Sequence, residues 1–584
     1  MNQDLKNQLL KNQLRKFSSH FLPIFVLAAA LYSCATEPAA TTAPAVDTAG
    51  EITQETVMLE EPSAPPVEEQ PESPSRDLKE PEYAEMRPDP IDRNELVVSF
   101  SSGEMELDFR KSYMAHEAQL FTAIYEGLFS YHPITMEPIL AAASRWATSE
   151  DKKQWTFTIR ANARFSNGDP VRAEDFRAAW LSLLEPRRNS PYSSLFDIIE
   201  GARDYRLGKL PASSVGISAP NNRTLVVRLN SPAAYFPSML CHHSFSPIHP
   251  SMLNNEKWEK PVSNGPFYIE EIDDKGIILA KNGSYWDAGQ VQLNKLAIRF
   301  SEDGEDAAAM WNSGEARWIQ GDVSLDALRD RSGIEVNVMF STHYYFIRSA
   351  RRPWNDYRLR RALSLVVPWE ELRQGYLLPA KTLIYPIPNY PEIEGLVETD
   401  EEEAKALLIE AGYPGGLGLP ELVIRIPPSP DAERIALYMA GAWYEVLGIR
   451  VKIDVVPYGQ YQQSLHRDDY DVGSTTWIGD FYDPYTFLQM WQRDSNLNEA
   501  HHDDSDYEAL IEKSMTQEGT ERWKTLAEAE ELLLARGNVL PITYNPAVNI
   551  INLNEIEGWY TNVMDIHPFK YMSINARRPL PGVA

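Results

Sequence analysis

The chain has 584 residues, of which 43% are hydrophobic, and its 84 acidic against 55 basic side chains leave a formal charge of -29. This acidic balance argues against a nucleic-acid ligand, because a phosphate backbone requires a basic surface. The two cysteines, Cys34 and Cys241, exclude a disulfide-rich scaffold, so the fold rests on its hydrophobic core. About 490 residues from position 95 onward are enough for two or three packed lobes.

The start of the chain predicts an export signal. Residues 1–33 combine a basic beginning with an apolar stretch at 21–32, which is too short to cross a bilayer as a helix. The signal ends in Leu-Tyr-Ser-Cys-Ala at 31–35, which resembles a bacterial lipobox. We therefore predict that Cys34 is lipidated and anchors the protein to a membrane. Simple cleavage and secretion is the alternative.

Residues 34–94 predict a disordered tether between this anchor and the fold. They are rich in Pro, Glu, Ala and Thr and lack any period that could bury one face. Part of the acidity of the chain lies in this stretch, so the net charge says little about the ligand.

From position 95 onward, strand and helix patterns alternate. Alternating or continuous apolar residues predict strands at 95–100, 155–160, 223–229, 276–280 and 450–456. Helical spacing predicts helices at 118–129, 173–184, 401–411 and 432–447. This alternation predicts mixed α/β lobes.

Several sequence blocks then occur together in one order. They are Ala-Ser-Arg-Trp at 143–146, Phe-Ser-Asn-Gly-Asp-Pro-Val-Arg-Ala-Glu-Asp-Phe at 165–176, Val-Ser-Asn-Gly-Pro-Phe at 262–267, Lys-Asn-Gly-Ser-Tyr-Trp-Asp at 281–287 and Asn-Asp-Tyr-Arg-Leu-Arg-Arg-Ala-Leu-Ser at 355–364. In these blocks the chain resembles the family 5 extracellular solute-binding proteins, and within that family the oligopeptide-binding proteins of ABC importers. The resemblance extends over residues 97–574.

The resemblance implies an α/β fold of the two-lobed periplasmic-binding-protein type II (venus flytrap) class, with an extra small subdomain and a ligand enclosed between the lobes. Lobe I would combine 95–133, 262–347 and 545–576, the small subdomain would be 134–261, and lobe III would be 348–544. Trp146, Trp155 and Phe157 are then expected to pack the small subdomain, and Asp356 to cap a helix.

The resemblance also implies a function without catalysis or cofactor. The protein would capture oligopeptides in the cell envelope or periplasmic space and deliver them to the permease subunits of an ABC transporter. It would act as a monomer that touches the membrane only through its lipid anchor. The main chain of the peptide would be held like an added strand.

Asp480 is the first candidate ligand anchor. It lies in Trp-Ile-Gly-Asp-Phe-Tyr-Asp-Pro at 477–484, where apolar neighbours would desolvate the carboxylate unless a cation pairs with it. The Gly and Pro residues are equally typical of an ordinary turn. The resemblance places Asp480 against the α-ammonium of the peptide. Thr476, Trp477 and Ile478 would then offer main-chain groups, with Trp477 either lining a pocket or packing the core.

Two further segments correspond to ligand contacts of the family. Tyr113, Met114 and Ala115 correspond to the loop between the first strand and the first helix, and Tyr192 corresponds to a small-subdomain tyrosine that closes over the ligand. The alternatives are a surface loop and a packed tyrosine.

The opposite end of the ligand is less well defined. Tripeptide binders of the family place basic residues where this chain has Ser474 and Ala432. Arg434, His466 or Arg467 could replace them, or the ligand could be a longer or modified peptide such as a cell-wall fragment.

Other functions remain open at this point. A metal or haem binder of the same fold would need ligands, but His242, His243, His249, His501 and His502 lack ligand spacing and fit surface loops, so no metal site is predicted. An envelope hydrolase would need a nucleophile or zinc motif, and none is present. A sensor or adhesin that feeds no transporter is the third alternative.

Overall fold

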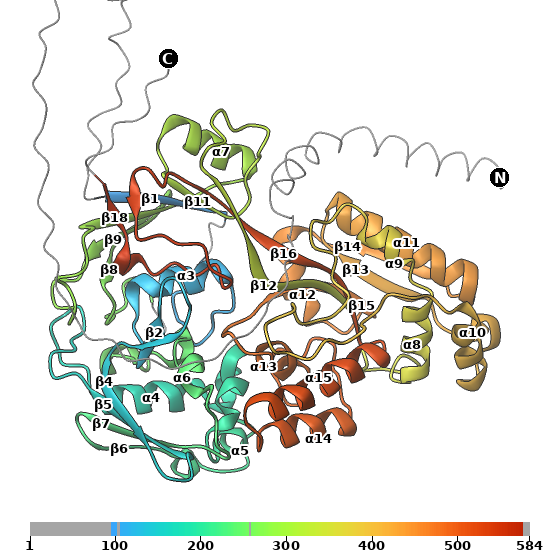
Figure 1. Ribbon diagram of the computed structural model, residues 1–584, viewed down its shortest axis with the longest axis horizontal. Coiled ribbons are helices and arrows are strands. Elements are labelled where there is room, and N and C mark those ends of the chain that lie inside the picture. The colour runs from blue at the N-terminus through green and yellow to red at the C-terminus, as the bar shows by residue number, and fades with distance from the viewer. Residues whose placement is uncertain (1–94, 102–104, 256–257, 576–584) are drawn as a thin grey trace, which may run out of the picture. The chain divides into compact units, whose positions relative to one another are not determined.

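The computed structural model describes residues 95–101, 105–255 and 258–575, which belong to one compact unit (Figure 1). The predicted export signal, Cys34 and the predicted tether lie outside the described residues. None of the helices in the described ranges is long and apolar enough to cross a membrane.

The largest element of the described chain is a ten-stranded mixed sheet. Its strands, in spatial order, are β14 (Val451–Val455), β13 (Leu422–Ile426), β15 (Val472–Ile478), β12 (Ile334–Ile347), β16 (Val539–Ile551), β11 (Trp318–Gln320), β1 (Glu95–Phe100), β10 (Lys295–Phe300), β9 (Gly276–Lys281) and β8 (Phe267–Asp273). The predicted strands that begin at 95, 276 and 450 are therefore present as β1, β9 and β14.

Two long strands join the halves of this sheet. β12 and β16 run antiparallel over most of their length (Figure 1), and their register shifts between Val338 and Thr342 and again between His343 and Tyr344. Both strands are mostly buried, as expected of Val-, Ile- and Tyr-rich segments in the centre of a sheet. Because the sheet continues through these strands, the lobe boundaries stay a prediction.

A separate four-stranded sheet is built from β4 (Ala143–Thr148), β5 (Gln154–Ile159), β7 (Thr224–Arg228) and β6 (Ile217–Asn221). Helix α4 (Ala173–Leu183) packs on it. The predicted core positions Trp155 and Phe157 are buried. Trp146 is 45% exposed, so its predicted core role is wrong. It lies on an edge strand and stacks on Trp155 with ring centroids 5.0 Å apart.

Helices α8 (Tyr357–Leu365), α10 (Glu401–Glu410) and α11 (Pro430–Leu447) share a hydrophobic core with β13. Asp356 caps α8 as predicted, because its carboxylate accepts a hydrogen bond from the backbone N–H of Arg358. Helices α14 (Ser505–Ser514) and α15 (Gly519–Ala535) pack against each other.

The helix predicted at 118–129 is shifted. Helix α3 spans Ala115–Ile124, and Phe129 belongs to strand β2 (Phe129–Tyr131). The backbone is already extended at Tyr125. Gly265 packs so closely on the backbone of Ile124 and Tyr125 that an added Cβ would lie 2.5 Å from the carbonyl carbon of Ile124. The apolar spacing continues past Ile124 because Leu128 and Phe129 are also buried, but they lie just before and at the start of strand β2.

Candidate functional site

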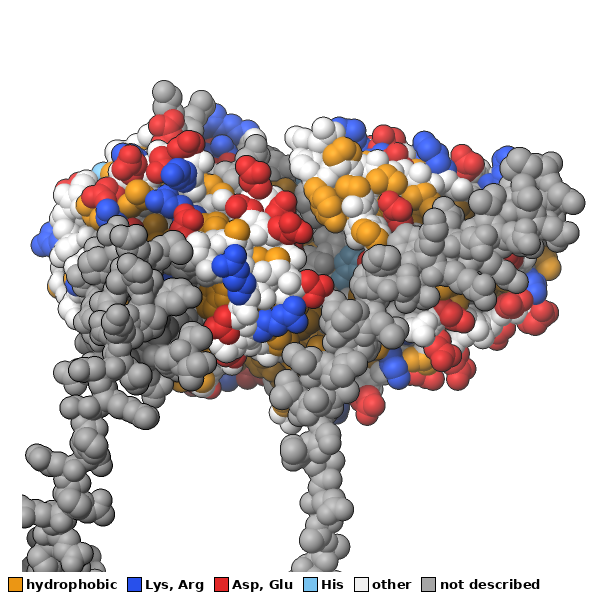
Figure 2. Space-filling view, turned by 90° about the horizontal axis from the view of Figure 1, so that it is seen from above, with side chains coloured by type: hydrophobic (Ala, Val, Ile, Leu, Met, Phe, Trp, Pro, Cys, Tyr) orange, Lys and Arg blue, Asp and Glu red, His pale blue; other side chains and the backbone are white. Residues whose placement is uncertain are grey.

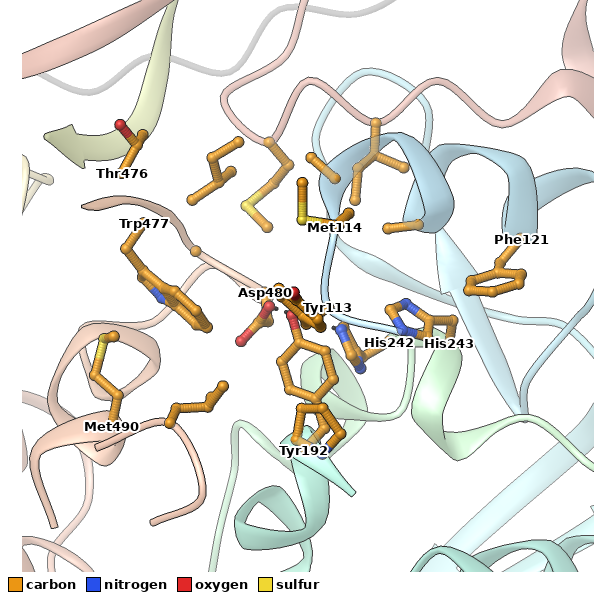
Figure 3. Close-up of a pocket in the computed structure, with 18 of the residues that line it drawn as sticks. Tyr113, Met114, Phe121, Tyr192, His242, His243, Thr476, Trp477, Asp480 and Met490 are labelled. Atoms are coloured by element: carbon orange, nitrogen blue, oxygen red, sulfur yellow. Dashed lines mark ion pairs between the residues drawn. The ribbon is translucent and has the colours of Figure 1, made fainter. Parts of the chain in front are cut away.

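A cavity of about 870 Å³ lies beside β15 and the N-terminal end of α3 (Figure 3). Its wall also includes residues 191–192, 241–243, 490–491 and 496–500. This volume is within the range of ligand pockets, and the mixture of aromatic rings with a few polar groups is typical of them. Away from the cavity, Figure 2 shows acidic and basic side chains interspersed over the viewed face, so the acidity of the chain marks no single patch there.

Strand β15 presents an edge to this cavity. On one side it pairs with β12, where His343 is opposite Thr476 and Thr342 is opposite Trp477. On the other side its pairing with β13 is confined to Val472. Within the described residues, 475–478 therefore have no strand partner on that side, and all four line the cavity. A strand edge of this kind can bind an extended peptide through main-chain hydrogen bonds.

Asp480 follows directly after this edge. The backbone N–H of Gly479 donates to the Phe340 carbonyl (2.9 Å), and the Phe340 ring approaches so closely that a Cβ on Gly479 would lie 2.6 Å from it. Only glycine fits this contact without displacing the ring. The Asp480 N–H then donates to Thr486 Oγ1 (2.8 Å), and the Tyr131 hydroxyl donates to the Asp480 carbonyl oxygen (3.1 Å). The backbone of Asp480 is thus fixed by its surroundings.

The Asp480 carboxyl group is buried at the cavity wall, with 8% of the residue exposed. Burial raises its pKa to about 7, although hydrogen bonds from Tyr192 and Thr486 act in the opposite direction. The only ion-pair partner that the described residues give Asp480 is His242, whose Nε2 lies 3.7 Å from Oδ1. Burial lowers the pKa of His242 well below its ordinary value. His242 is therefore neutral, and among the described residues the carboxylate has no cationic partner.

Asp483, in the same loop, is in a different situation. Its carboxylate accepts two hydrogen bonds from Arg522, from Nη1 to Oδ2 (2.7 Å) and from Nη2 to Oδ1 (2.9 Å). Both side chains are buried, and the guanidinium lies 3.9 Å from the ring centroid of Tyr235. A bidentate pair of this geometry neutralises the charge within the fold.

The cavity brings together every residue that the sequence predicted for the amino end of the ligand. Those residues are Tyr113, Met114, Ala115, Tyr192, Thr476, Trp477, Ile478 and Asp480. In Figure 3, the Tyr192 side chain points toward Asp480, to which it is hydrogen-bonded. Trp477 lines the cavity, and its indole N–H also donates to the Thr486 carbonyl (3.1 Å), so the ring is held by the fold. That these residues bind a ligand stays a prediction.

The cavity also includes residues that the sequence did not indicate. Phe121, Met490 and His243 line it, but apolar and aromatic residues at these spacings are typical of any core. The expected surface location of His242 is wrong, because the residue is 4% exposed and its ring centroid lies 4.5 Å from that of Tyr192. His502 is buried too, with Nδ1 2.7 Å from the Trp491 carbonyl oxygen. The described residues contain no group of three or more side chains that could hold a metal ion.

Of the three basic side chains suggested for the far end of the ligand, His466 lines the cavity, whereas Arg434 and Arg467 do not. Arg434 pairs with Asp431 at 2.8 Å, and this contact follows from their spacing of three residues on one helix. Ser474 lies at the cavity. Its backbone N–H donates a hydrogen bond to the Tyr461 hydroxyl, which in turn donates to the Ser474 carbonyl oxygen.

Comparisons with known proteins agree with this fold and cavity. The family "Bacterial extracellular solute-binding proteins, family 5 Middle" matches residues 136–499. Oligopeptide-binding protein OppA of Bacillus subtilis is 30% identical over 435 residues, covering 70% of this chain and 80% of that protein. Periplasmic oligopeptide-binding protein OppA of Salmonella typhimurium is 28% identical over 496 residues, covering 80% of this chain and 89% of that protein.

Solved structures show the same architecture. The murein tripeptide binding protein MppA of Escherichia coli superposes with a TM-score of 0.73 at 25% identity, covering 83% of this chain and 99% of that one. A periplasmic oligopeptide-binding protein from Borrelia burgdorferi gives the same score at 24% identity, covering 82% of this chain and 100% of that one. The fold is therefore the two-lobed type II fold of solute-binding proteins. The chain belongs to family 5 of the bacterial extracellular solute-binding proteins.

Proposed function

We propose that this protein captures oligopeptides outside the cytoplasmic membrane and delivers them to an ABC transporter for import. The peptide α-ammonium pairs with Asp480, and the first residues of the peptide lie along 475–478 as an added strand. Tyr113, Met114, Ala115 and Tyr192 cover the amino end from the opposite wall. The protein is a monomeric lipoprotein, held in the cell envelope through Cys34, and performs no catalysis.

The observation that carries the proposal is the unpaired, buried carboxyl group of Asp480 beside an open strand edge. A carboxylate in this position is unfavourable until a cation enters the cavity. A peptide amino terminus supplies that cation, and its main chain supplies the donors and acceptors that a strand edge needs. The family relationship supports the same ligand class, because the relatives described above are oligopeptide-binding proteins.

Calorimetry with the purified protein tests the proposal. Pentaalanine should bind, and both N-acetylation of the peptide and Asp480→Asn should weaken binding by tens-fold, since a charge-assisted hydrogen bond contributes about 2 kcal/mol. The matched control Asp326→Asn removes an exposed carboxylate outside the cavity and should leave affinity unchanged. Equal binding of acetylated and free peptide would refute the role of Asp480.

A further inference from the structure

The charges around the cavity are strongly biased toward carboxylates. Among the described residues that line it, four are acidic, Glu126, Asp480, Glu499 and Asp565, and only Lys570 is a Lys or Arg residue. A ligand carboxylate would need a cation that the fold does not already use. The partners of each basic group therefore decide whether this cavity accepts such a ligand.

Lys570 is already occupied. Its Nζ donates to the Tyr285 hydroxyl (3.1 Å) and lies 3.4 Å from Asp287 Oδ2 and 3.8 Å from Glu126 Oε1. The residue is 7% exposed, and the ammonium lies 5.2 Å from the ring centroid of Trp286. Turning Lys570 toward a ligand would leave the buried Glu126 without its cation, which is costly.

The histidines of the lining supply little positive charge. Burial lowers the pKa of His242 well below its ordinary value, that of His243 to about 3 and that of His343 to about 4. These three imidazoles are neutral at neutral pH. His466 differs because its hydrogen bond to Glu499 raises its pKa, with Nδ1 2.9 Å from Oε1. Its charge is therefore matched by Glu499.

The carboxylates that line the cavity have fewer positively charged partners than they need for neutralisation. Asp565 accepts a hydrogen bond from Asn549 (2.8 Å) and lies 3.0 Å from His567 Nε2. Asp480 has no cationic partner among the described residues. The only ion-pair partner that the described residues give Glu499 is His466, whose imidazole is 60% exposed to solvent. The Glu499 side chain is 24% exposed and lies at the cavity.

We infer that Glu499 is a specificity residue, and that the cavity selects peptides that carry positive charge beyond their amino terminus and rejects ligand carboxylates within it. A short peptide with a free carboxyl terminus would bring a negative charge against Glu499 with no free Lys or Arg to meet it. A blocked peptide, or one long enough to carry its terminus out of the cavity, avoids that repulsion. A basic side chain would instead pair with Glu499. This inference rests on the proposed function.

Calorimetry with defined peptides tests the inference on the wild-type protein. Trialanine amide should bind at least as tightly as trialanine with a free carboxyl terminus. In amidated pentaalanine, Lys placed in turn at each position after the first should improve affinity about tenfold over Glu for at least one position. If amidation weakens trialanine binding tenfold, or if Glu peptides match Lys peptides at every position, the inference is wrong.

Glu499→Gln removes the charge while keeping the size of the side chain. It should reduce the preference for Lys over Glu several-fold. The control Glu174→Gln removes a carboxylate that pairs with Arg177 away from the cavity, and it should keep the full preference. An unchanged preference in Glu499→Gln would overturn the assignment.

The two proposals fail in different ways. If free and acetylated peptides bind equally, the role of Asp480 fails, and if neither peptide binds, the proposed function fails. If acetylation abolishes binding but a free carboxyl terminus is required, only the inference about Glu499 and the far end of the cavity fails.

Discussion

Asp480 and Asp483 lie in one loop and are both buried. They differ in whether the surrounding residues neutralise the negative charge. Asp483 receives a bidentate guanidinium from Arg522, whereas Asp480 faces a neutral histidine, a tyrosine and a threonine. The first charge is compensated by the fold itself, so that removing its partner would destabilise the protein. The second is left for a ligand to compensate, so it weakens the free protein and strengthens the complex.

The largest expected effect comes from breaking the compensated pair. Arg522→Met leaves Asp483 buried without a cation, and it should lower the free energy of unfolding by about 4 kcal/mol. Urea denaturation measures this change. The control is Lys524→Met on the same helix, whose ion pair with Glu521 is exposed, and it should unfold like the wild type. Equal behaviour of the two variants would remove the distinction between the two aspartates.

Removing the uncompensated charge of Asp480 should change the free energy of unfolding in the opposite direction. Asp480→Asn should raise the free energy of unfolding at about pH 8, by about 2 kcal/mol or more. Because the folded pKa of Asp480 is raised to about 7 from 3.8, the protonated group favours the folded state at low pH. That contribution is lost as pH rises through 7. The gain from Asn should therefore vanish at about pH 4, where urea denaturation should find the two proteins equal.

Peptide affinity should follow the ionisation of Asp480. Since the carboxyl group must be charged to pair with an ammonium, pentaalanine should bind about tenfold more weakly at about pH 5.5 than at about pH 7.5. Calorimetry across this range would measure the profile. The profile of Asp480→Asn should be flat, and a wild-type slope that persists in this variant would assign the titration to another group.

The smallest effect is expected from removing the Tyr192 hydroxyl, which stabilises the charged form of Asp480 through a hydrogen bond. A hydrogen bond from Tyr192 lowers the pKa of Asp480 against the effect of burial. Tyr192→Phe should therefore raise the pKa of Asp480 further and weaken pentaalanine binding about fivefold near neutral pH, which corresponds to about 1 kcal/mol. A shift of the pH profile to higher pH would distinguish this effect from a loss of ring packing.

Much of the fold was predictable because its signals are local. The caps and periodicity of α4, α10 and α11 place those helices within a few residues of their observed ends. The predictions were wrong where contacts between distant parts of the chain determine the end of a helix or the exposure of a side chain. Apolar spacing alone continued α3 through Leu128, whereas Gly265, far along the chain, packs where the helix ends. Trp146 lies on an outer strand, and strand order is not encoded in its own neighbourhood.

The site was predictable from sequence where its residues lie close together in one segment of the chain. Asp480 and the predicted residues 476–478 are separated only by Gly479, and the resemblance of the whole chain placed Tyr113 and Tyr192 opposite them. His242 looked like a loop histidine because nothing nearby in sequence shows that it packs against Tyr192 and Asp480. The pairing of His466 with Glu499, which are separated by 33 residues, depends equally on the folded chain.

The central position of β16 also constrains how the molecule folds. This strand, from the last part of the chain, lies between β12 and β11, so the sheet cannot be completed until nearly the entire polypeptide is present. Contacts between residues so distant in sequence slow folding. A chain cut before Val539 would expose two unpaired strand edges, which are prone to join other chains. Truncated copies should therefore aggregate rather than persist as partly working receptors, and release from the ribosome should precede formation of the cavity.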